Sequence, residues 1–209
     1  MVGEMVCGKL FYLQWHITEK CRNNCRHCYS NGKRMVEETT MQDFINILTD
    51  VVSVCNRWGR AAQITLIGGD PLLHDNFCDF VEILKDNPKI RIIVAGNPET
   101  LNSFMINWLK DKIFAFQLSI DGNEEIHDWF RYPGSYRVTM CCIKEAVKKG
   151  LRIHVMTTVS RANIEQLEEI MYIVYSAGAH RWAFYRYVPP LFQTSYLDPD
   201  KYFEALAAV

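Results

Sequence analysis

Cys21, Cys25 and Cys28 lie within eight residues, spaced Cys-x3-Cys-x2-Cys, directly after an apolar run. Thiolates are soft ligands that bind iron–sulfur clusters, zinc and Cu(I). A [4Fe–4S] cluster that is held by protein alone needs four cysteines. Three cysteines leave one iron without a protein ligand, and an open coordination position is where a metal centre does chemistry. The spacing therefore predicts an iron–sulfur centre with one open iron.

A zinc site is the alternative on ligand type, since His27 lies beside the three cysteines and would supply a fourth ligand. Zinc sites usually pair two separated half-sites, and neither a second Cys-x2-Cys nor a His-x3-His follows here. Disulfides would suit a secreted chain. The start, Met1-Val2-Gly3-Glu4, has no signal-peptide character, so we expect a cytoplasmic protein with reduced thiols.

The composition is that of an ordinary globular protein, with 49% hydrophobic and 22% charged residues among 209. A formal net charge of −1 gives no reason to expect nucleic acid or an anionic membrane as a partner. No apolar run approaches the roughly 18 residues of a membrane helix. Four further cysteines fall within helical patterns, and we expect them to be small buried residues: Cys55, Cys78, Cys141 and Cys142.

Apolar runs alternate six times with segments of helical spacing. The expected strands are residues 10–17, 62–67, 90–95, 113–120, 152–159 and 181–188, and the expected helices are 40–58, 77–87, 99–110, 136–149, 164–176 and one that begins near 199. Strict alternation implies parallel strands with helices on the outside. Six units are too few for a closed eight-stranded barrel. We therefore expect an α/β fold, a partial (β/α)6 barrel, with an open doubly wound sheet as the alternative.

We expect residues 1–209 to form one core domain, with residues 1–9 as a lead-in. The last residues have a helical pattern with neither a cap nor a polar tail, so we also expect the core to be truncated at its C-terminus.

Polar segments follow the expected strands at their carboxyl ends, where parallel barrels carry their active sites. The cysteine segment follows the first strand, and Gly68-Gly69-Asp70-Pro71 follows the second. Glycine lets a ligand approach the backbone closely, and the Asp70 carboxylate can accept a hydrogen bond from an ammonium group. Arg131, in a loop after the fourth strand, can pair with a carboxylate through its planar guanidinium. A plain turn and a solvated surface charge are the respective alternatives.

The cysteine segment resembles the motif of the radical S-adenosylmethionine (SAM) superfamily, Cys-x3-Cys-x-aromatic-Cys, with His27 at the aromatic position. The resemblance extends over nearly the whole chain and implies the same partial barrel. It implies a [4Fe–4S] cluster on Cys21, Cys25 and Cys28 whose open iron chelates the amino and carboxylate groups of SAM. An electron then cleaves SAM to methionine and a 5′-deoxyadenosyl radical, which abstracts a hydrogen atom from the substrate.

The resemblance also implies which residues contact SAM. The Gly68–Pro71 segment matches the family's Gly-Gly-Glu-Pro, which meets the SAM amino group, and Asp70 keeps the charge while losing one methylene. Ser119 and its neighbours at strand ends would meet the carboxylate and ribose, and His27 and the backbone near Val188 would meet the adenine. The expected cofactor site is His27, Tyr29, Gly68, Gly69, Asp70, Pro71, Asn97, Ser119, Asp121, Arg131 and Val188. The sequence indicates no general acid or base.

Within the superfamily, three segments look most like the peptide and protein maturases of SPASM type: residues 15–18, 118–122 and 131–136. This resemblance implies a peptide or protein substrate and a reductant such as a flavodoxin or ferredoxin. A radical SAM enzyme acting on a small cofactor precursor is the first alternative. A non-catalytic zinc or electron-transfer module is the second, and it leaves the Gly68–Pro71 segment unexplained.

Overall fold

The computed structural model describes residues 10–30, 38–187 and 198–207. A single parallel sheet runs through them in the order β1-β2-β3-β4-β5-β6. Its strands are β1 (Phe11–Thr18), β2 (Ala62–Gly68), β3 (Ile90–Ala95), β4 (Ala115–Ser119), β5 (Ile153–Val159) and β6 (Arg181–Arg186). Spatial order equals chain order, so each crossover moves one strand along the sheet, as the alternation predicted.

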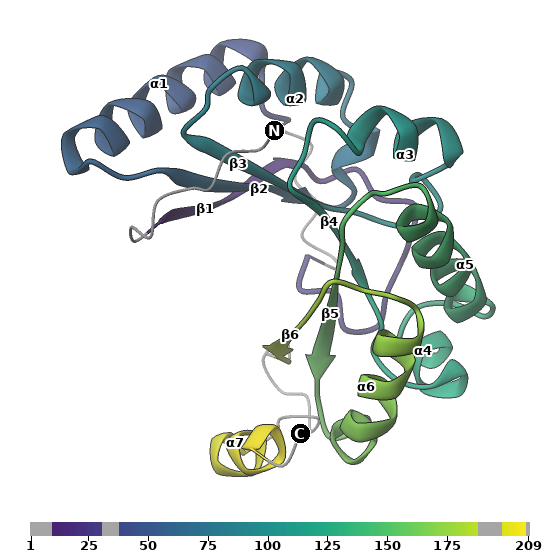
Figure 1. The fold of residues 1–209 in the computed structure, drawn as a ribbon. Coiled ribbons are helices and arrows are strands. Elements are labelled where there is room, and N and C mark those ends of the chain that lie inside the picture. The colour runs from purple at the N-terminus through teal and green to yellow at the C-terminus, as the bar shows by residue number, and fades with distance from the viewer. Residues whose placement is uncertain (1–9, 31–37, 188–197, 208–209) are drawn as a thin grey trace.

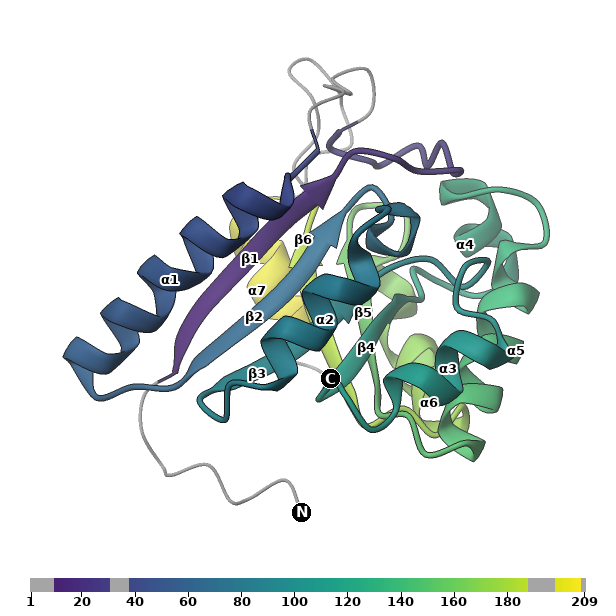
Figure 2. The same ribbon diagram turned by 90° about the horizontal axis from the view of Figure 1, so that it is seen from above.

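Helices alternate with the strands along the chain. They are α1 (Met41–Trp58), α2 (Phe77–Lys85), α3 (Ser103–Leu109), α4 (Glu124–Phe130), α5 (Ser135–Lys148), α6 (Leu167–Ser176) and α7 (Pro199–Ala207), with short 3-10 turns η1 (Pro71–Leu73) and η2 (Ile164–Gln166). The sheet bends into an open arc with α1, α2, α3, α5 and α6 on its convex side (Figure 1), and the view from above shows the same arrangement (Figure 2). This confirms the partial (β/α)6 barrel.

The first helix, expected over 40–58, begins at Met41 and is capped by Thr40. The Thr40 hydroxyl accepts a hydrogen bond from the Asp43 N–H at 3.1 Å, and the Asp43 carboxylate accepts one from the Thr40 N–H at 3.3 Å. This reciprocal capping box satisfies amide donors that have no partner within the helix. At the other end, Gly59 adopts the left-handed conformation (φ 62°) in which α1 terminates.

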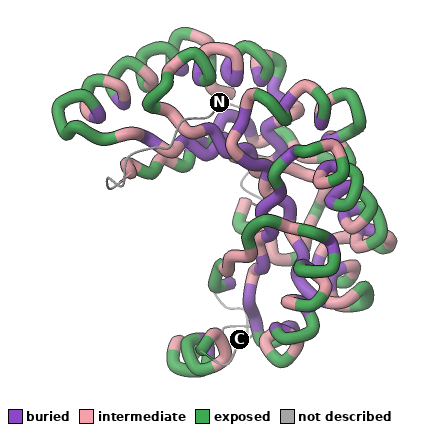
Figure 3. Tube along the Cα trace, in the orientation of Figure 1, coloured by how far each residue is buried: buried purple, intermediate pink, exposed green. Residues whose placement is uncertain are grey.

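The core fills the space between the sheet and its helices. Phe44 of α1 stacks on Phe80 of α2 with 4.0 Å between ring centroids, and on Trp15 of β1 at 4.8 Å. Each fully buried side chain of this size contributes about 1.5–3 kcal/mol. Buried positions follow the sheet and the inner sides of the helices in Figure 3.

Residues that alternate with the core residues lie on the concave face of the sheet. The concave side chains of β1 and β6 meet: the Gln14 amide donates a hydrogen bond to the Tyr185 hydroxyl at 3.2 Å. Because β1 and β6 are the two edge strands, this contact spans the concave face from one edge to the other.

The structure differs from the expected elements most clearly in three places. The loop expected after the fourth strand contains α4, whose cap Asn123 accepts a hydrogen bond from the Ile126 N–H at 3.2 Å. The helix expected from 99 begins at Ser103, because Asn102 caps it through the Met105 N–H. The strand expected over 113–120 is shorter, Ala115–Ser119.

Only two of the four cysteines that were expected to be buried are buried. Cys55 and Cys142 are buried, but Cys78 and Cys141 are exposed. Cys78 follows the buried Phe77, and Cys141 precedes the buried Cys142. Adjacent helical residues point about 100° apart, since a turn takes 3.6 residues, and this rotation turns both thiols to solvent. Along the described part of the chain, none of the helices has the length and apolarity needed to cross a membrane.

Candidate functional site

The cysteine loop, residues 19–30 after β1, packs directly against the turn after β2. The Gly69 N–H donates to the Thr18 carbonyl at 2.9 Å, and the Asp70 N–H donates to the Lys20 carbonyl at 2.8 Å. A Cβ added at Gly69 would lie 2.5 Å from the Lys20 carbonyl oxygen and 2.8 Å from the Cys21 Cβ. The missing side chain of Gly69 therefore makes room for the backbone of the cysteine loop.

Two hydrogen-bond donors lie beside the Cys21 thiol, the first of the loop. The Asn23 backbone N–H and the Asn97 side-chain amide each lie 3.4 Å from Cys21 Sγ as donors. Such donors stabilise negative charge on sulfur. Asn97 is one of the predicted cofactor residues, and in the structure its amide supports a predicted metal ligand.

The donor set fits an iron–sulfur cluster. Burial raises the pKa of the Cys25 thiol, and the nearby Arg131 guanidinium opposes that rise by favouring the thiolate. In the described ranges, no three His, Cys, Asp or Glu side chains surround a position for one metal ion. His27, the fourth ligand of the zinc alternative, instead faces Asp121, with Nε2 3.7 Å from Oδ2.

Asp70 is 1% exposed, and its carboxylate is already hydrogen-bonded. It accepts from the Thr100 hydroxyl at 2.7 Å and from the Leu72 N–H at 3.3 Å, where it caps η1 beginning at Pro71. Burial raises the pKa of Asp70, and these donors partly counter the rise. Both Asp70 and Pro71 are therefore fixed in place beside the cysteine loop.

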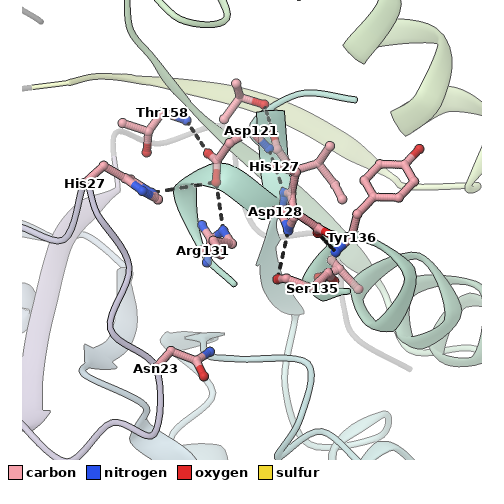
Figure 4. A network of polar contacts seen from close by, with 12 residues as sticks. Asn23, His27, Asp121, His127, Asp128, Arg131, Ser135, Tyr136 and Thr158 are labelled. Atoms are coloured by element: carbon pink, nitrogen blue, oxygen red, sulfur yellow. Dashed lines mark hydrogen bonds and ion pairs between the residues drawn. The ribbon is translucent and has the colours of Figure 1, made fainter. Parts of the chain in front are cut away.

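A buried ion pair lies beside the loop, at the carboxyl end of β4 (Figure 4). Asp121 is fully buried and accepts a hydrogen bond from Arg131 Nε at 2.8 Å. Burial alone would raise the pKa of Asp121, but Arg131 foremost, with His27 and His127, holds it well below its usual value. Because Arg131 uses Nε for Asp121, its terminal nitrogens lie on the other edges of the guanidinium. Asp121 thus fixes the orientation of the Arg131 guanidinium.

The backbone around Asp121 is fixed by neighbouring elements. The Thr158 N–H donates to Asp121 Oδ1 at 3.0 Å, and the Asn163 amide donates to the Asp121 carbonyl at 2.7 Å. His127 of α4 accepts from the Asp121 N–H at 3.1 Å through Nδ1. Strand β5, α4 and the turn before η2 thus all contact one aspartate.

The corner between α4 and α5 was not predicted from the sequence. His127 Nε2 lies 3.1 Å from the Ser135 hydroxyl, and the Asp128 carboxylate accepts from the Gly134 and Tyr136 N–H groups at 2.6 and 2.7 Å. The sequence signal for this corner was an aspartate, Asp128, that lies six to eight residues before the Gly-Ser-Tyr start of α5. A capping box joins residues three apart, so this longer spacing does not match it. This corner fixes Arg131, which lies between the two helices.

Three further residues were predicted to contact the cofactor: Ser119, Tyr29 and Val188. Ser119 ends β4 and is half-buried, whereas Tyr29 is 63% exposed. The Tyr29 hydroxyl lies 2.7 Å from His16 Nε2 on the concave face of β1. Val188 lies outside the described residues.

A model of the family described as the radical SAM superfamily matches residues 15–172. An "AdoMet-dependent heme synthase" of Methanosarcina barkeri is 28% identical over 182 residues, which cover 85% of this chain and 50% of that protein. A "GTP 3',8-cyclase" of Cronobacter sakazakii is 26% identical over 170 residues, 78% of this chain and 51% of that protein. The chain therefore spans about half the length of these curated relatives.

Solved structures share the fold at low identity. The chain anSMEcpe with bound AdoMet and a Kp18Cys peptide superposes with a TM-score of 0.81 at 16% identity, over 96% of this chain and 59% of that one. Streptococcus suis SuiB bound to precursor peptide SuiA gives a TM-score of 0.71 at 12% identity, over 86% of this chain and 40% of that one. At these identities the likeness concerns the fold alone.

Proposed function

Because this chain belongs to the radical SAM superfamily, whose cofactors are a [4Fe–4S] cluster and SAM, we propose that it cleaves SAM reductively and modifies a peptide or protein. When bound, the two cofactors supply a 5′-deoxyadenosyl radical that removes one hydrogen atom from the substrate. The observation that carries this proposal is the assembly of the cysteine loop, the Gly69–Asp70 turn and the Asp121–Arg131 pair at one edge of the sheet.

Different residues of the chain hold the cluster and SAM. Cys21, Cys25 and Cys28 would hold three irons of the cluster and leave the fourth iron for SAM. Asp70 and the carbonyls of its turn accept from the SAM amino group, while Arg131 pairs with the SAM carboxylate. The remaining predicted contacts are His27, Tyr29, Gly68, Gly69, Pro71, Asn97, Ser119, Asp121 and Val188.

A peptide or protein substrate is supported by two fold neighbours, anSMEcpe and SuiB, which were solved with bound peptides. The concave face has exposed polar and aromatic side chains, among them Tyr12, His16 and Tyr185, which can bind an extended chain. A small-molecule substrate is the second candidate, and the curated relatives named as heme synthases and GTP cyclases favour it.

We also propose a cytoplasmic setting with a flavodoxin or ferredoxin as electron donor. Cys25, Cys28, Cys55, Cys78, Cys141 and Cys142 are free thiols, as expected in a reducing compartment. One electron per SAM is needed to break its carbon–sulfur bond, and the substrate does not supply it in that step.

The test is SAM cleavage by protein purified without oxygen and reconstituted with iron and sulfide. After reduction with dithionite, we expect 5′-deoxyadenosine from the native chain and none from Cys25→Ala. Cys78→Ala is the matched control, because it removes an exposed thiol outside the loop. Zinc in place of iron in natively isolated protein, or equal activity of Cys25→Ala, would refute the proposal.

The same preparation separates the two substrate candidates. Deuterium moves into 5′-deoxyadenosine when the correct deuterated substrate is present. We expect this transfer from a peptide, and transfer from GTP or a porphyrin alone would identify the enzyme as acting on a small molecule.

A further inference from the structure

A second group of basic side chains lies at the amino ends of the strands, away from the cysteine loop. We call it the basic cluster, and its members are Arg91, Arg152, His154 and Arg181. Arg91 lies near the start of β3, Arg152 directly precedes β5, and Arg181 begins β6. The site proposed for SAM lies at the other ends of these strands.

All four side chains lie on the concave face. Ile92 and Ile153, which neighbour them in sequence, are packed in the core on the helix side. Side chains alternate along a strand, so Arg91 and His154 point the other way, and Arg152 shares the face of His154. His154 and Arg181 are register partners on adjacent strands, which places them side by side.

The aromatic ring of Phe114, just before β4, lies among these groups. The guanidinium carbons of Arg91 and Arg152 are 4.1 and 4.4 Å from its centroid, and the His154 ring meets its edge at 5.9 Å. A ring face attracts a cation, but it carries no negative charge. The Phe114 ring therefore holds the Arg91 and Arg152 guanidinium groups close together without neutralising their positive charges.

Two buried nitrogens of the basic cluster have no hydrogen-bond partner. His154 is 4% exposed with Nδ1 unpaired, and Arg91 Nε is likewise buried and unpaired. Buried polar groups are nearly always bonded. Within the described ranges, no carboxylate lies at ion-pair distance from Arg91, Arg152 or Arg181. Burial foremost, and then the surrounding cations, lower the pKa of His154 to about 4.

We propose that the basic cluster is an oxyanion site, which binds a carboxylate or a phosphate group on the concave face. The planar guanidinium groups match both anions, and neutral His154 can donate a hydrogen bond through Nδ1. From His154 to Thr158, beside the SAM-binding end, β5 rises about 13 Å. The site is therefore separate from the cysteine loop, and its existence does not depend on the proposed radical chemistry.

The test uses inorganic phosphate and acetate as probes, each compared with chloride at equal ionic strength. We expect saturable phosphate binding by calorimetry, with the ring signal of His154 shifting in NMR over the same concentration range. Arg91→Gln and Arg181→Gln should each weaken binding about tenfold, the effect of one lost charge-assisted hydrogen bond. A response to acetate as well identifies a general oxyanion site, and a response to phosphate alone identifies a phosphoryl site.

Arg57→Gln is the matched control, because it removes the same charge from the last turn of α1, outside the cluster. Arg181 is exposed, so its variant keeps the test valid even if Arg91→Gln folds poorly. The proposal is wrong if phosphate acts no differently from chloride, or if both cluster variants bind as the native chain does. Formation of 5′-deoxyadenosine, measured on the same protein, tests the proposed function separately.

Discussion

Asp121 is the residue on which the polar end of the barrel depends. It accepts from Arg131 and from the Thr158 N–H, and it is fully buried. Its pKa is lowered in the folded chain, so its contribution to stability is present above the unfolded pKa of about 3.9 and is lost only in strong acid. At neutral pH the pair is intact, and Arg131 is oriented by a fixed charge.

Replacing Asp121 with Asn removes that charge and leaves the Arg131 guanidinium, 13% exposed, without a counter-ion. Breaking a buried pair by removing one partner costs about 3–5 kcal/mol, so we expect the free energy of unfolding to fall by that order. We also expect SAM to bind at least about tenfold more weakly, measured by equilibrium dialysis on reconstituted protein. Asp50→Asn, on the exposed side of α1, should change neither quantity, and unchanged SAM affinity in Asp121→Asn would contradict the positioning role.

His127 predicts a dependence of stability on pH. Burial foremost, and then Arg131, lower its pKa from 6.5 to about 4 in the folded chain. Between these values the unfolded chain binds the extra proton, so stability falls as pH drops from about 6.5 to 4, by up to roughly 3 kcal/mol. His127→Gln should show a smaller loss in urea unfolding over this range, whereas the exposed His180→Gln should behave as the native chain. Equal slopes for His127→Gln and the native chain would show that His127 does not titrate as described.

At the scale of elements, the turn after β2 and the cysteine loop act as one unit. The Asp70 N–H bonds to Lys20 of the loop, and the Gly69 N–H bonds to Thr18, the last residue of β1 before the loop. The Arg26 N–H also donates to the Phe130 carbonyl at 2.7 Å, which joins the loop to the end of α4. The close approach at Gly69 therefore helps to position the thiols.

Gly69→Ala should displace the cysteine loop, because the added methyl would meet the Lys20 carbonyl oxygen and Cys21 Cβ at 2.5 and 2.8 Å. We expect reduced iron and sulfide per protein after reconstitution and a weaker EPR signal of the reduced cluster. Gly59→Ala is the control: it has open space but a positive φ, so it should cost about 1–2 kcal/mol of stability without changing cluster content. Full cluster assembly in Gly69→Ala would mean that the loop is positioned by other contacts.

At the scale of the whole molecule, the sequence predicted the order of strands and helices and the edge of the sheet that carries the polar residues. Alternating periodicity is a local signal, and the carboxyl ends of parallel strands must meet at one edge. The sequence did not predict the Asp121–Arg131 pair or the basic cluster. Asp121 and Arg131 are separated by α4, which was read as a loop, and Arg91 and His154 meet only through the register of three strands. Such long-range contacts leave no periodic trace in the sequence.

The open arc makes a last prediction about local stability. In the sheet that the described residues form, β1 and β6 have one neighbouring strand each, whereas β2 to β5 have two. The burial pattern of β6 is mostly exposed or intermediate, while β5 is largely buried. Local opening is easiest where few buried contacts hold a strand, so in hydrogen exchange followed by mass spectrometry we expect β6 peptides to exchange fastest and β3 to β5 peptides slowest. Tyr185→Phe, which removes the contact with Gln14 across the concave face, should speed exchange at β6 and leave β3 unchanged. Protection of β6 equal to that of β4 would show that the open edge is held by contacts other than its single ladder.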